Sequence, residues 1–391
     1  MTNLPQGWEV KKLGEIGEIV TGSTPSKSNL DFYGKDYPFF KPSDFEQGYF
    51  LENAGDNLSK LGFDKARQLP PKTILVVCIG SLGKVALTRV IGSCNQQINA
   101  IIPHKNIIAE YIYYYCISSK FQSILFSKAP QTTLAILNKT EFSKLEIIYP
   151  KDIKEQERIV GILDESFAKI DESIKILEQN LLNLDELMQS ALQKAFNPLK
   201  DNAKENYKLP QGWKWKSLEE ISENISAGGD KPKNCTESKT AKNQIPVYAN
   251  GVNNNGLVGY TDKATIIKPS LTISARGTIG FVCIRKEPYF PIVRLISLIP
   301  CENILCLHYL YFCLNFFIAK GEGSSIPQLT IPKFKSLQIP LPPLKEQEQI
   351  AKHLDFVFEK TKALKELYTK ELKDYEELKQ SLLNKAFKGE L

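Results

Sequence analysis

The chain has 391 residues, which at about 100–200 residues per domain suggests two to four folding units. Its composition of 42% hydrophobic and 24% charged residues is close to the average for soluble globular proteins and argues against global disorder, collagen-like repetition and a membrane bundle. The 50 Lys and Arg residues against 44 Asp and Glu give a net charge of +6, which permits a polyanionic partner without requiring one.

The first segment, residues 1–150, is predicted to be a mixed α/β domain. Short apolar runs over 73–79 and 84–90 predict strands, and a longer one over 109–126 predicts a helix. Clusters of Gly, Pro, Asn and Ser separate these elements. The opening residues contain neither a basic region nor an apolar run, so no secretory signal is expected.

The next segment, residues 151–197, is predicted to be one long helix. Its apolar residues recur at alternating steps of four and three, which is the heptad pattern of a coiled coil. Pro150 precedes the helix, and Asn197-Pro198 marks its end. The predicted seam consists of Leu163, Phe167, Ile170, Ile174, Leu177, Leu181, Leu184, Met188, Ala191 and Ala195.

A polar linker over 198–208 leads to a second mixed α/β domain, residues 209–342, and to a second long helix, residues 343–391. The second domain is predicted to contain strands over 245–248, 270–274 and 279–284 and a helix over 306–320. The stretch 304–319 is shorter than a membrane span and contains polar residues, so a buried helix is expected there. The second helical seam is predicted at Leu354, Val357, Thr361, Leu364, Tyr368, Leu372, Tyr375, Leu378 and Leu382, with one slip in phase after Tyr368.

The chain is a tandem duplication. The motif Leu-Pro-Gln-Gly-Trp at residues 4–8 recurs at 209–213, an offset of 205. The Gly-x-x-Gly turn at 80–83 recurs 197 residues later, and Lys-Glu-Gln-Glu at 154–157 recurs 191 residues later. The offset shrinks only within each α/β domain, because loops tolerate insertions and deletions that a helix packed along its length does not.

No residue pattern predicts catalysis or metal binding. The eight Cys residues include no Cys-x-x-Cys and the three His residues complete no zinc-site spacing, so buried free thiols in a reducing compartment are expected. The sequence Gly80-Ser81-Leu82-Gly83 resembles part of a phosphate-binding loop but has two residues between the glycines where four are required, so a tight turn is predicted. Nucleophile-elbow, zinc-protease and amino-methyltransferase motifs are missing.

The two α/β domains instead offer loops rich in Ser, Thr, Asn, Gln, Lys and Arg. Asn and Gln can pair with adenine, Arg and Lys with guanine, and hydroxyl groups can hold phosphates. We therefore predict a DNA interface in these loops. The candidate residues are Thr24, Ser26, Lys27, Lys41, Ser43, Ser81, Lys84, Gln96, Gln97, Gln131, Thr132 and Thr133 in the first domain, and Lys231, Lys233, Asn250, Arg276, Thr278, Ser324, Ser325 and Gln328 in the second.

The order of these features resembles the specificity subunit of type I restriction-modification systems. The resemblance rests on the duplicated Leu-Pro-x-Gly-Trp opening, on a Pro-rich strand end that runs into Glu-Gln at 339–347 and more loosely at 148–156, and on the helix endings at 192–196 and 383–389. It covers essentially the whole chain. At 148–152, Tyr-Pro-Lys-Asp replaces the Pro-rich version, which shifts the expected helix boundary by a few residues.

The resemblance implies a non-catalytic DNA-reading subunit of the bacterial or archaeal cytoplasm. Its two target-recognition domains would each read one half of a bipartite, asymmetric site in double-stranded DNA, and its two long helices would pack as an antiparallel coiled coil. Two copies of an adenine-methylating subunit would dock on the helices, and restriction and translocase subunits would join them. S-adenosylmethionine, magnesium and ATP would be bound by those partners and not by this chain.

Apolar residues beside the predicted seams indicate a further protein-binding surface, because exposed apolar rows usually mark a partner. The candidate partner-binding residues are Ile159, Ile162, Leu187, Leu192, Leu367 and Leu383.

Two other functions stay open at the level of sequence. The chain could be a nuclease or methyltransferase with unrecognised motifs, in which case it would cleave or methylate DNA unaided. It could also be a coiled-coil scaffold whose α/β domains bind proteins, which salt-dependent binding to one duplex sequence over others would exclude.

Overall fold

The computed structural model describes residues 4–129, 135–196, 209–318, 321–322 and 329–391. The chain divides into two compact units. The first unit comprises Met1–Leu177 together with Thr369–Leu391, and the second comprises Glu178–Tyr368. Each unit therefore contains one α/β domain and parts of both long helices, so the predicted domains 1–150 and 209–342 are each completed by helix from the other half of the chain. The predicted linker at 198–208 lies outside the described residues.

The first unit is built on a five-stranded sheet in the order β2-β9-β6-β7-β4, beside a three-stranded sheet β5-β3-β8 and the pair β1-β10. The strands are β1 (Trp8–Lys12), β2 (Gly17–Thr21), β3 (Tyr33–Phe40), β4 (Phe50–Leu51), β5 (Asp56–Leu58), β6 (Ile74–Val77), β7 (Val85–Thr88), β8 (Ser93–Cys94), β9 (Ile98–Pro103) and β10 (Glu146–Pro150). The short helices are α1 (Leu13–Ile16), η1 (Leu30–Phe32), η2 (Pro42–Gln47), α2 (Lys60–Lys65), α3 (Ala109–Ile117), α4 (Ser119–Lys128) and α5 (Lys139–Ser143).

The second unit repeats this topology. The sheet β12-β19-β15-β17 corresponds to β2-β9-β6-β7, β14-β13-β18 corresponds to β5-β3-β8, and β11-β21 corresponds to β1-β10, with an additional pair β16-β20. The strands are β11 (Lys214–Ser217), β12 (Ser222–Ala227), β13 (Ile245–Tyr248), β14 (Leu257–Thr261), β15 (Ser270–Ile273), β16 (Thr278–Ile279), β17 (Val282–Arg285), β18 (Phe290–Pro291), β19 (Ile296–Pro300), β20 (Gly321–Glu322) and β21 (Gln338–Leu341). The short helices are η3 (Asn253–Gly256), α7 (Leu307–Phe317) and α8 (Ile331–Lys335).

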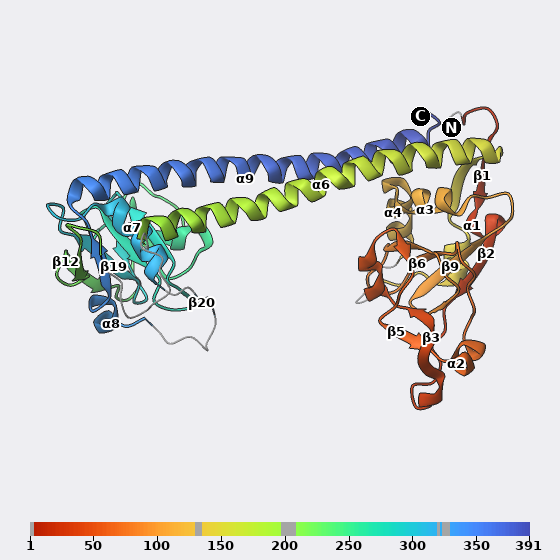
Figure 1. Cartoon of the computed structure of the whole chain (residues 1–391), viewed down its shortest axis with the longest axis horizontal. Helices are drawn as coiled ribbons and strands as arrows, with labels where there is room; N and C mark the ends of the chain where they lie inside the picture. The colour runs from red at the N-terminus through yellow and green to blue at the C-terminus, as the bar shows by residue number, and fades with distance from the viewer. Residues whose placement is uncertain (1–3, 130–134, 197–208, 319–320, 323–328) are drawn as a thin grey trace. The chain divides into compact units, whose positions relative to one another are not determined.

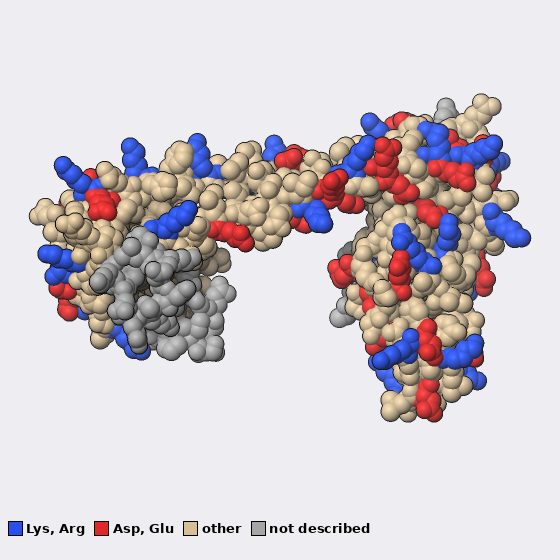
Figure 2. Space-filling view, viewed as in Figure 1, with Lys and Arg blue, Asp and Glu red and all other residues tan. Residues whose placement is uncertain are grey.

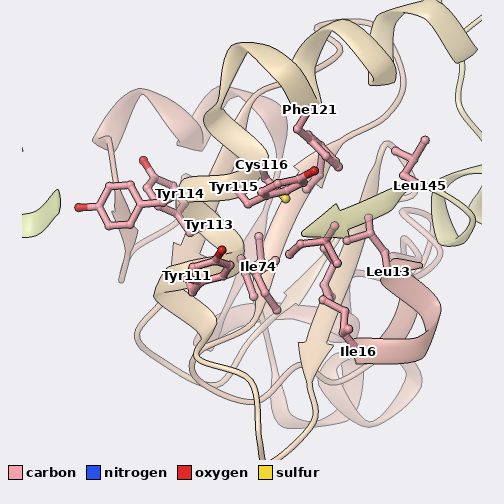
Figure 3. Packing of buried hydrophobic residues seen from close by; sticks show 14 of the residues in the cluster. Leu13, Ile16, Ile74, Tyr111, Tyr113, Tyr114, Tyr115, Cys116, Phe121 and Leu145 are labelled. Atoms are coloured by element: carbon pink, nitrogen blue, oxygen red, sulfur yellow. The ribbon is translucent and has the colours of Figure 1, made fainter. Parts of the chain in front are cut away.

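The core of the first unit lies between α3 and the large sheet. Tyr111 and Tyr115 of α3 are almost fully buried there, and Figure 3 shows Tyr111 beside Ile74 of β6. Tyr114 is also buried but lies beside Tyr113. Each large buried side chain contributes about 1.5–3 kcal/mol relative to an exposed one. The predicted helix 109–126 is in fact two helices, because Ser118 ends α3 and its hydroxyl oxygen accepts a hydrogen bond from the backbone N–H of Phe121 in α4, at 3.3 Å.

The two long helices are α6 (Ile153–Phe196) and α9 (Leu344–Ala386), drawn in yellow-green and blue in Figure 1. In the first unit Lys379 of α9 forms an ion pair with Asp171 of α6, and in the second unit Lys365 forms one with Asp185. Because residue numbers rise on one helix as they fall on the other, the helices pair antiparallel. The predicted mixed α/β fold with an antiparallel coiled coil is confirmed.

The predicted seam of α6 is correct, since each of its residues is buried or half-buried. The predicted seam of α9 is wrong at Leu364 and Leu378, whose side chains are 38% and 45% exposed. Lys365 and Lys379 occupy the seam instead, so α9 continues in phase without the expected slip. A search for apolar residues alone misses a seam that contains lysine.

A buried glutamine fixes the start of each long helix. Gln156 accepts a hydrogen bond from the backbone N–H of Ile108 at 2.9 Å and donates to the carbonyl of Pro150 at 2.9 Å. Gln347 accepts from the N–H of Cys306 at 2.9 Å and donates to the carbonyl of Pro342 at 2.9 Å. The repeated Lys-Glu-Gln-Glu motif therefore has a structural role, which is to join each helix to the domain that precedes it in the sequence.

Three of the predicted partner-binding residues are core residues. Ile159 and Leu383 are fully buried in the core of the first unit, and Leu192 is buried in the core of the second. Their predicted exposure is wrong because the helix ends pack against the α/β domains and not only against each other. Ile162 is half-buried, whereas Leu187 and Leu367 are 50% and 61% exposed.

Candidate nucleic-acid interface

The candidate residues of the first unit gather at one edge of its large sheet. Thr21 at the end of β2 lies opposite Asn99 of β9, and Ile98 lies opposite Val77 at the end of β6. In turn, β6 pairs with the start of β7. The loops 22–28, 78–84 and 95–97 therefore leave the sheet at the same edge, which we call the first loop edge.

The opposite end of the same strands faces the long helices. Strand β9 ends at Pro103, and residues just beyond it contact Gln156 of α6, including the carbonyl of Asn106 at 3.3 Å from the Gln156 amide nitrogen. Within the first unit of Figure 1, the long helices lie beside α3 and α4, whereas β3, β5 and α2 are at the other end. The first loop edge thus points away from the start of α6.

The second unit has a loop edge of the same construction. Ala227 of β12 and Ile273 of β15 both lie opposite Ile296 of β19, and Ile273 also lies opposite Val282 of β17. Loops 228–233, 274–281 and 292–295 consequently leave one edge, which we call the second loop edge. Here too the far end of the central strand leads to the long helix, because the carbonyl of Ile304 accepts a hydrogen bond from Gln347 at 2.9 Å.

Close backbone packing holds each loop edge together. The N–H of Gly22 donates to the carbonyl of Ile98 at 3.0 Å, and the N–H of Gly228 donates to the carbonyl of Leu295 at 2.9 Å. A Cβ on Gly22 would lie 2.1 Å from the carbonyl oxygen of Asn95, and one on Gly228 would lie 2.6 Å from the nitrogen of Ile292. Only glycine fits at these two positions.

The Gly-x-x-Gly segments are tight turns, as predicted. Gly80 and Gly83 have φ values of +83° and +92°, and Gly277 and Gly280 have values of +70° and +81°. Each segment joins two antiparallel strands, although the predicted strand 279–284 is divided between β16 and β17. Neither segment has the geometry of a phosphate-binding loop, because no helix follows the second glycine.

Side-chain amides fasten the middle loop of each edge, 95–97 in the first unit and 292–295 in the second, to the loop that contains the tight turn. In the first unit Gln97 accepts from the amide of Asn95 at 2.8 Å and donates to the carbonyl of Ile79 at 3.4 Å. In the second unit Asn250 donates to the carbonyl of Val293 at 2.6 Å and accepts from the N–H of Ala275 at 2.8 Å. The predicted candidates Gln97 and Asn250 are therefore positioning residues.

The structure brings most of the described candidates together. Thr24, Ser26, Lys27, Ser81, Gln96 and Gln97 belong to the first loop edge, and Lys231, Lys233, Arg276 and Thr278 belong to the second. Asn250 follows β13 and contacts the second loop edge through Val293 and Ala275.

Three candidates are held by neighbouring structure. Lys41 and Lys84 form ion pairs with Asp56 and Glu46, and Ser43 lies in η2. The candidates Gln131, Thr132, Thr133, Ser324, Ser325 and Gln328 lie outside the described residues. The residue Ala135, just after the first of those segments, accepts a hydrogen bond from the N–H of Gly80 in the first tight turn at 3.3 Å. In the second unit the N–H of Leu329 donates to the carbonyl of Ala275 at 3.3 Å.

Two arginines at the loop edges were missed by the sequence analysis. Arg67 donates to the carbonyl of Thr21, and Arg294 is exposed in the loop between β18 and β19. The signal for Arg294 was present, because the offset of 197 that relates the two tight turns also relates Gln97 to Arg294. No comparable signal marked Arg67.

The second loop edge is the more basic of the two. It carries Lys231, Lys233, Arg276 and Arg294, all exposed and none in an ion pair within the described part of the chain, against one acidic residue, Asp230. Elsewhere basic and acidic residues are interspersed on the face shown in Figure 2. This distribution agrees with the modest net charge.

The described residues contain no group of three or more His, Cys, Asp or Glu side chains that could hold a metal ion. Burial raises the pKa of Cys78 and of Cys94 to about 12, which keeps both thiols protonated and unreactive at neutral pH. In the described part of the chain, no helix could span a membrane, given its length and hydropathy. The predicted helix 306–320 is α7, a buried helix of the second core.

Comparison with known proteins shows similarity over nearly the whole chain. It is 37% identical over 191 residues to the type I restriction enzyme HindI specificity subunit of Haemophilus influenzae, a match that covers 47% of this chain and 42% of that protein. It is 24% identical over 378 residues to the MjaIX specificity subunit of Methanocaldococcus jannaschii, covering 87% and 84% of the two chains.

The fold is also found in solved structures. A chain from a study of complex assembly and conformational transition of the type I R-M system matches with a TM-score of 0.81 and 19% identity, and all of both chains is covered. The HsdS subunit of Thermoanaerobacter tengcongensis matches with a TM-score of 0.60 and 20% identity over 99% of this chain and 98% of that one.

The family match is duplicated, as the repeat requires. The family described as "Type I restriction modification DNA specificity domain" matches at residues 5–182 and again at 210–374. Each match contains one loop edge and most of the long helix that follows it. This chain therefore belongs to the type I restriction-modification DNA specificity family.

Proposed function

We propose that the chain is the sequence-specific DNA-binding subunit of a type I restriction-modification complex and reads a bipartite target, one half with each unit. The observation that carries the proposal is the pair of loop edges, which share a backbone framework but present different side chains. Because the side chains differ, the two half-sites differ, and the target is asymmetric. The family match supports this function.

The residues at the loop edges suit both kinds of DNA contact. Exposed basic residues such as Lys27, Lys231 and Lys233 can neutralise phosphates, and a hydroxyl group such as that of Ser26 can hydrogen-bond to a phosphate oxygen. Amide and guanidinium groups can discriminate base edges in the major groove. Sequence preference and salt dependence are therefore expected together.

The long helices are proposed to dock two copies of a methyltransferase subunit. Each unit exposes apolar residues from both helices. Among them are Ile176 and Leu378 in the first unit and Leu187 and Leu367 in the second, with exposed fractions of 55%, 45%, 50% and 61%. The offset of 191 relates Ile176 to Leu367 and Leu187 to Leu378. Two equivalent apolar sites fit two copies of one partner.

Chemistry is assigned to the partners. The chain would bind DNA and orient the complex, while S-adenosylmethionine, magnesium and ATP would be bound by methyltransferase and restriction or translocase subunits. The reactions would then follow the DNA position that this chain selects.

The test is to express the chain with its natural methyltransferase partner in a host without adenine methylation and to map methylated adenines across the genome. One motif with two half-sites and a fixed gap is expected. Methylation without a motif, or by the partner alone with the same motif, would overturn the proposal. Retained association of the two proteins without any DNA preference would favour the scaffold alternative.

Partner docking has a separate test. Replacing Leu187 and Leu367 with Asp should remove the copy bound to the second unit and leave one copy per chain, as measured by native mass spectrometry. The matched variant, with Ile176 and Leu378 replaced, should remove the other copy. Two copies retained in both variants would show that these residues do not form the docking sites.

A further inference from the structure

We propose that the middle loop of each loop edge carries the base-reading residue of its half-site: Gln96 for an adenine in one half and Arg294 for a guanine in the other. This inference rests on the proposed function and adds the residue and the base to it. The two residues come from structurally equivalent loops, 95–97 between β8 and β9 and 292–295 between β18 and β19.

The position of these loops is central. The strand that follows the loop, β9 or β19, is flanked on both sides, by β2 and β6 in the first unit and by β12 and β15 in the second. The neighbouring loops therefore leave the edge on either side of the middle loop. A side chain at this point is surrounded by residues that can hold the DNA backbone, which is the arrangement a base-reading group requires.

In the first unit the hydrogen bonds distinguish Gln96 from Gln97. Both polar atoms of the Gln97 side chain are used within the domain, by Asn95 and by the carbonyl of Ile79. Gln96 is exposed, and its amide oxygen accepts one hydrogen bond, from the Thr24 hydroxyl at 2.5 Å. This contact orients the amide and leaves the second lone pair of its oxygen and both hydrogens of its nitrogen for a ligand.

In the second unit, too, one residue fixes the loop and another is left for a ligand, but the residues are different. Asn250 uses both atoms of its amide to fix the loop, so it corresponds in role to Gln97. Arg294 is exposed, and within the described residues its guanidinium forms no hydrogen bond or ion pair. All five of its N–H donors remain for a ligand.

The backbone of the second loop is also unusual. Val293 and Arg294 are consecutive residues in the left-handed region, with φ values of +53° and +59°. A β-branched residue is a rare occupant of that region, and such conformations persist where the surroundings impose them. The clamp by Asn250 on the carbonyl of Val293 at 2.6 Å supplies the restraint and fixes the direction in which the Arg294 side chain leaves the loop.

The chemistry of the two side chains then gives the bases. A glutamine amide donates to N7 and accepts from N6 of adenine, and an arginine guanidinium donates to both O6 and N7 of guanine. Arginine cannot make the adenine pairing, and glutamine cannot make the guanine pairing, with the same geometry. The first half-site should therefore contain an adenine that depends on Gln96, and the second a guanine that depends on Arg294.

The experiment compares methylation motifs of the complete complex, formed with the natural methyltransferase partner, for Arg294→Ala, Arg294→Lys and Gln96→Ala. Arg294→Ala should lower discrimination at one guanine position of one half-site about tenfold or more and leave the other half-site unchanged. Gln96→Ala should do the same at one adenine position of the other half-site. Lys286→Ala removes an exposed basic side chain beyond the far end of β17 and serves as the matched control, with an unchanged motif expected.

Arg294→Lys separates base reading from phosphate binding. Lysine restores a phosphate contact but not the bidentate geometry, so relaxed guanine preference in both variants supports the inference. If Arg294→Lys restores the wild-type motif while Arg294→Ala weakens all sites equally, Arg294 binds phosphate and the inference is wrong. A variant that loses methylation altogether is examined by selecting bound duplexes from a random pool, where an intact guanine preference would overturn the inference.

The outcomes also separate this inference from the proposed function. A wild-type complex without a bipartite motif contradicts the proposed function. A wild-type bipartite motif that stays unchanged in all three variants contradicts only the assignment of Gln96 and Arg294.

Discussion

The two loop edges share a framework and differ in their side chains. Both are formed where four corresponding strands end, β2, β9, β6 and β7 in the first unit and β12, β19, β15 and β17 in the second. Both need a glycine at the closest backbone approach, and both fasten the middle loop with a side-chain amide. The first edge presents the neutral amide of Gln96, whereas the second presents four exposed basic residues, including Arg294, that form no ion pair with the residues that the structure describes. After duplication, the framework could stay fixed while the residues that face DNA diverged.

The comparison extends to the cores, where each unit is closed by the end of a helix that begins in the other. Leu383→Ala should destabilise the first unit and Leu192→Ala the second, each by about 2–5 kcal/mol, because each substitution leaves a cavity in a closed core. Hydrogen exchange should show the loss of protection in the affected unit. Leu378→Ala, on the exposed face of α9, is the control and should change stability by under about 0.5 kcal/mol.

This arrangement predicts which residues must be exchanged together in a hybrid of two family members. Residues 1–150 do not form a complete core, because Leu383 and Ala386 of the C-terminal helix and Phe387 directly after it pack into that core. A hybrid that receives only residues 1–150 from another member of the family should be less stable than one that also receives residues 369–391. Equal thermal stability of both hybrids would mean that these contacts contribute little.

The helix starts offer a smaller and symmetrical test. Gln156→Ala and Gln347→Ala each remove a buried amide that satisfies a backbone N–H and two carbonyls. A buried polar group left without its partner costs about 1–3 kcal/mol, so both variants should lose stability by similar amounts. Urea unfolding measures the difference. A large loss in one variant and none in the other would show that the duplicated motif has diverged in role.

The paired helices break the symmetry of the duplication. At the offset of 191, Lys365 and Lys379 of α9 correspond to Ile174 and Met188 of α6. Because Asp185 and Asp171 are both 61% exposed, each ion pair is expected to contribute at most about 1 kcal/mol. Replacing the lysines with the α6 residues, Lys365→Ile and Lys379→Met, should change the free energy of unfolding by about 1 kcal/mol or less. A loss well above that would assign these lysines a larger role in pairing the helices.

Sequence patterns predicted the elements whose signal is local. The seam of α6 follows from the spacing of its apolar residues, and the sheet strands follow from short β-branched runs such as 74–77 and 270–273. The seam of α9 could be predicted only in part, since two of its positions are lysines that pair with aspartates of α6 located 180 and 208 residues earlier in the sequence. The packing of Leu383 against the first domain is likewise a long-range contact without a local signal.

The loop edges were predictable as a set of polar loops but not as a site. Which loops share an edge depends on strand order, and which amides are already used depends on contacts such as that of Asn250 with Ala275. Arg294 illustrates both points, because it is the single polar residue of the short loop 292–295 between two apolar strands, so the sequence does not mark this loop as a site. Aligning the two halves at the tight turns would have placed it opposite Gln97.

The smallest expected effect is a difference in cysteine reactivity between the two units, which chemical labelling can measure without any substitution. All three cysteines of the first unit, Cys78, Cys94 and Cys116, are buried, and burial raises the pKa of each. Four cysteines of the second unit are only half-buried: Cys235, Cys283, Cys301 and Cys306. Because the thiolate is the reactive form and needs access to the reagent, iodoacetamide at pH 8 should modify the second unit first, as peptide mass spectrometry can measure. In urea the difference should disappear, since unfolding exposes every thiol. Early modification of Cys78 or Cys94 in the native protein would show that the first core opens more readily than its packing indicates.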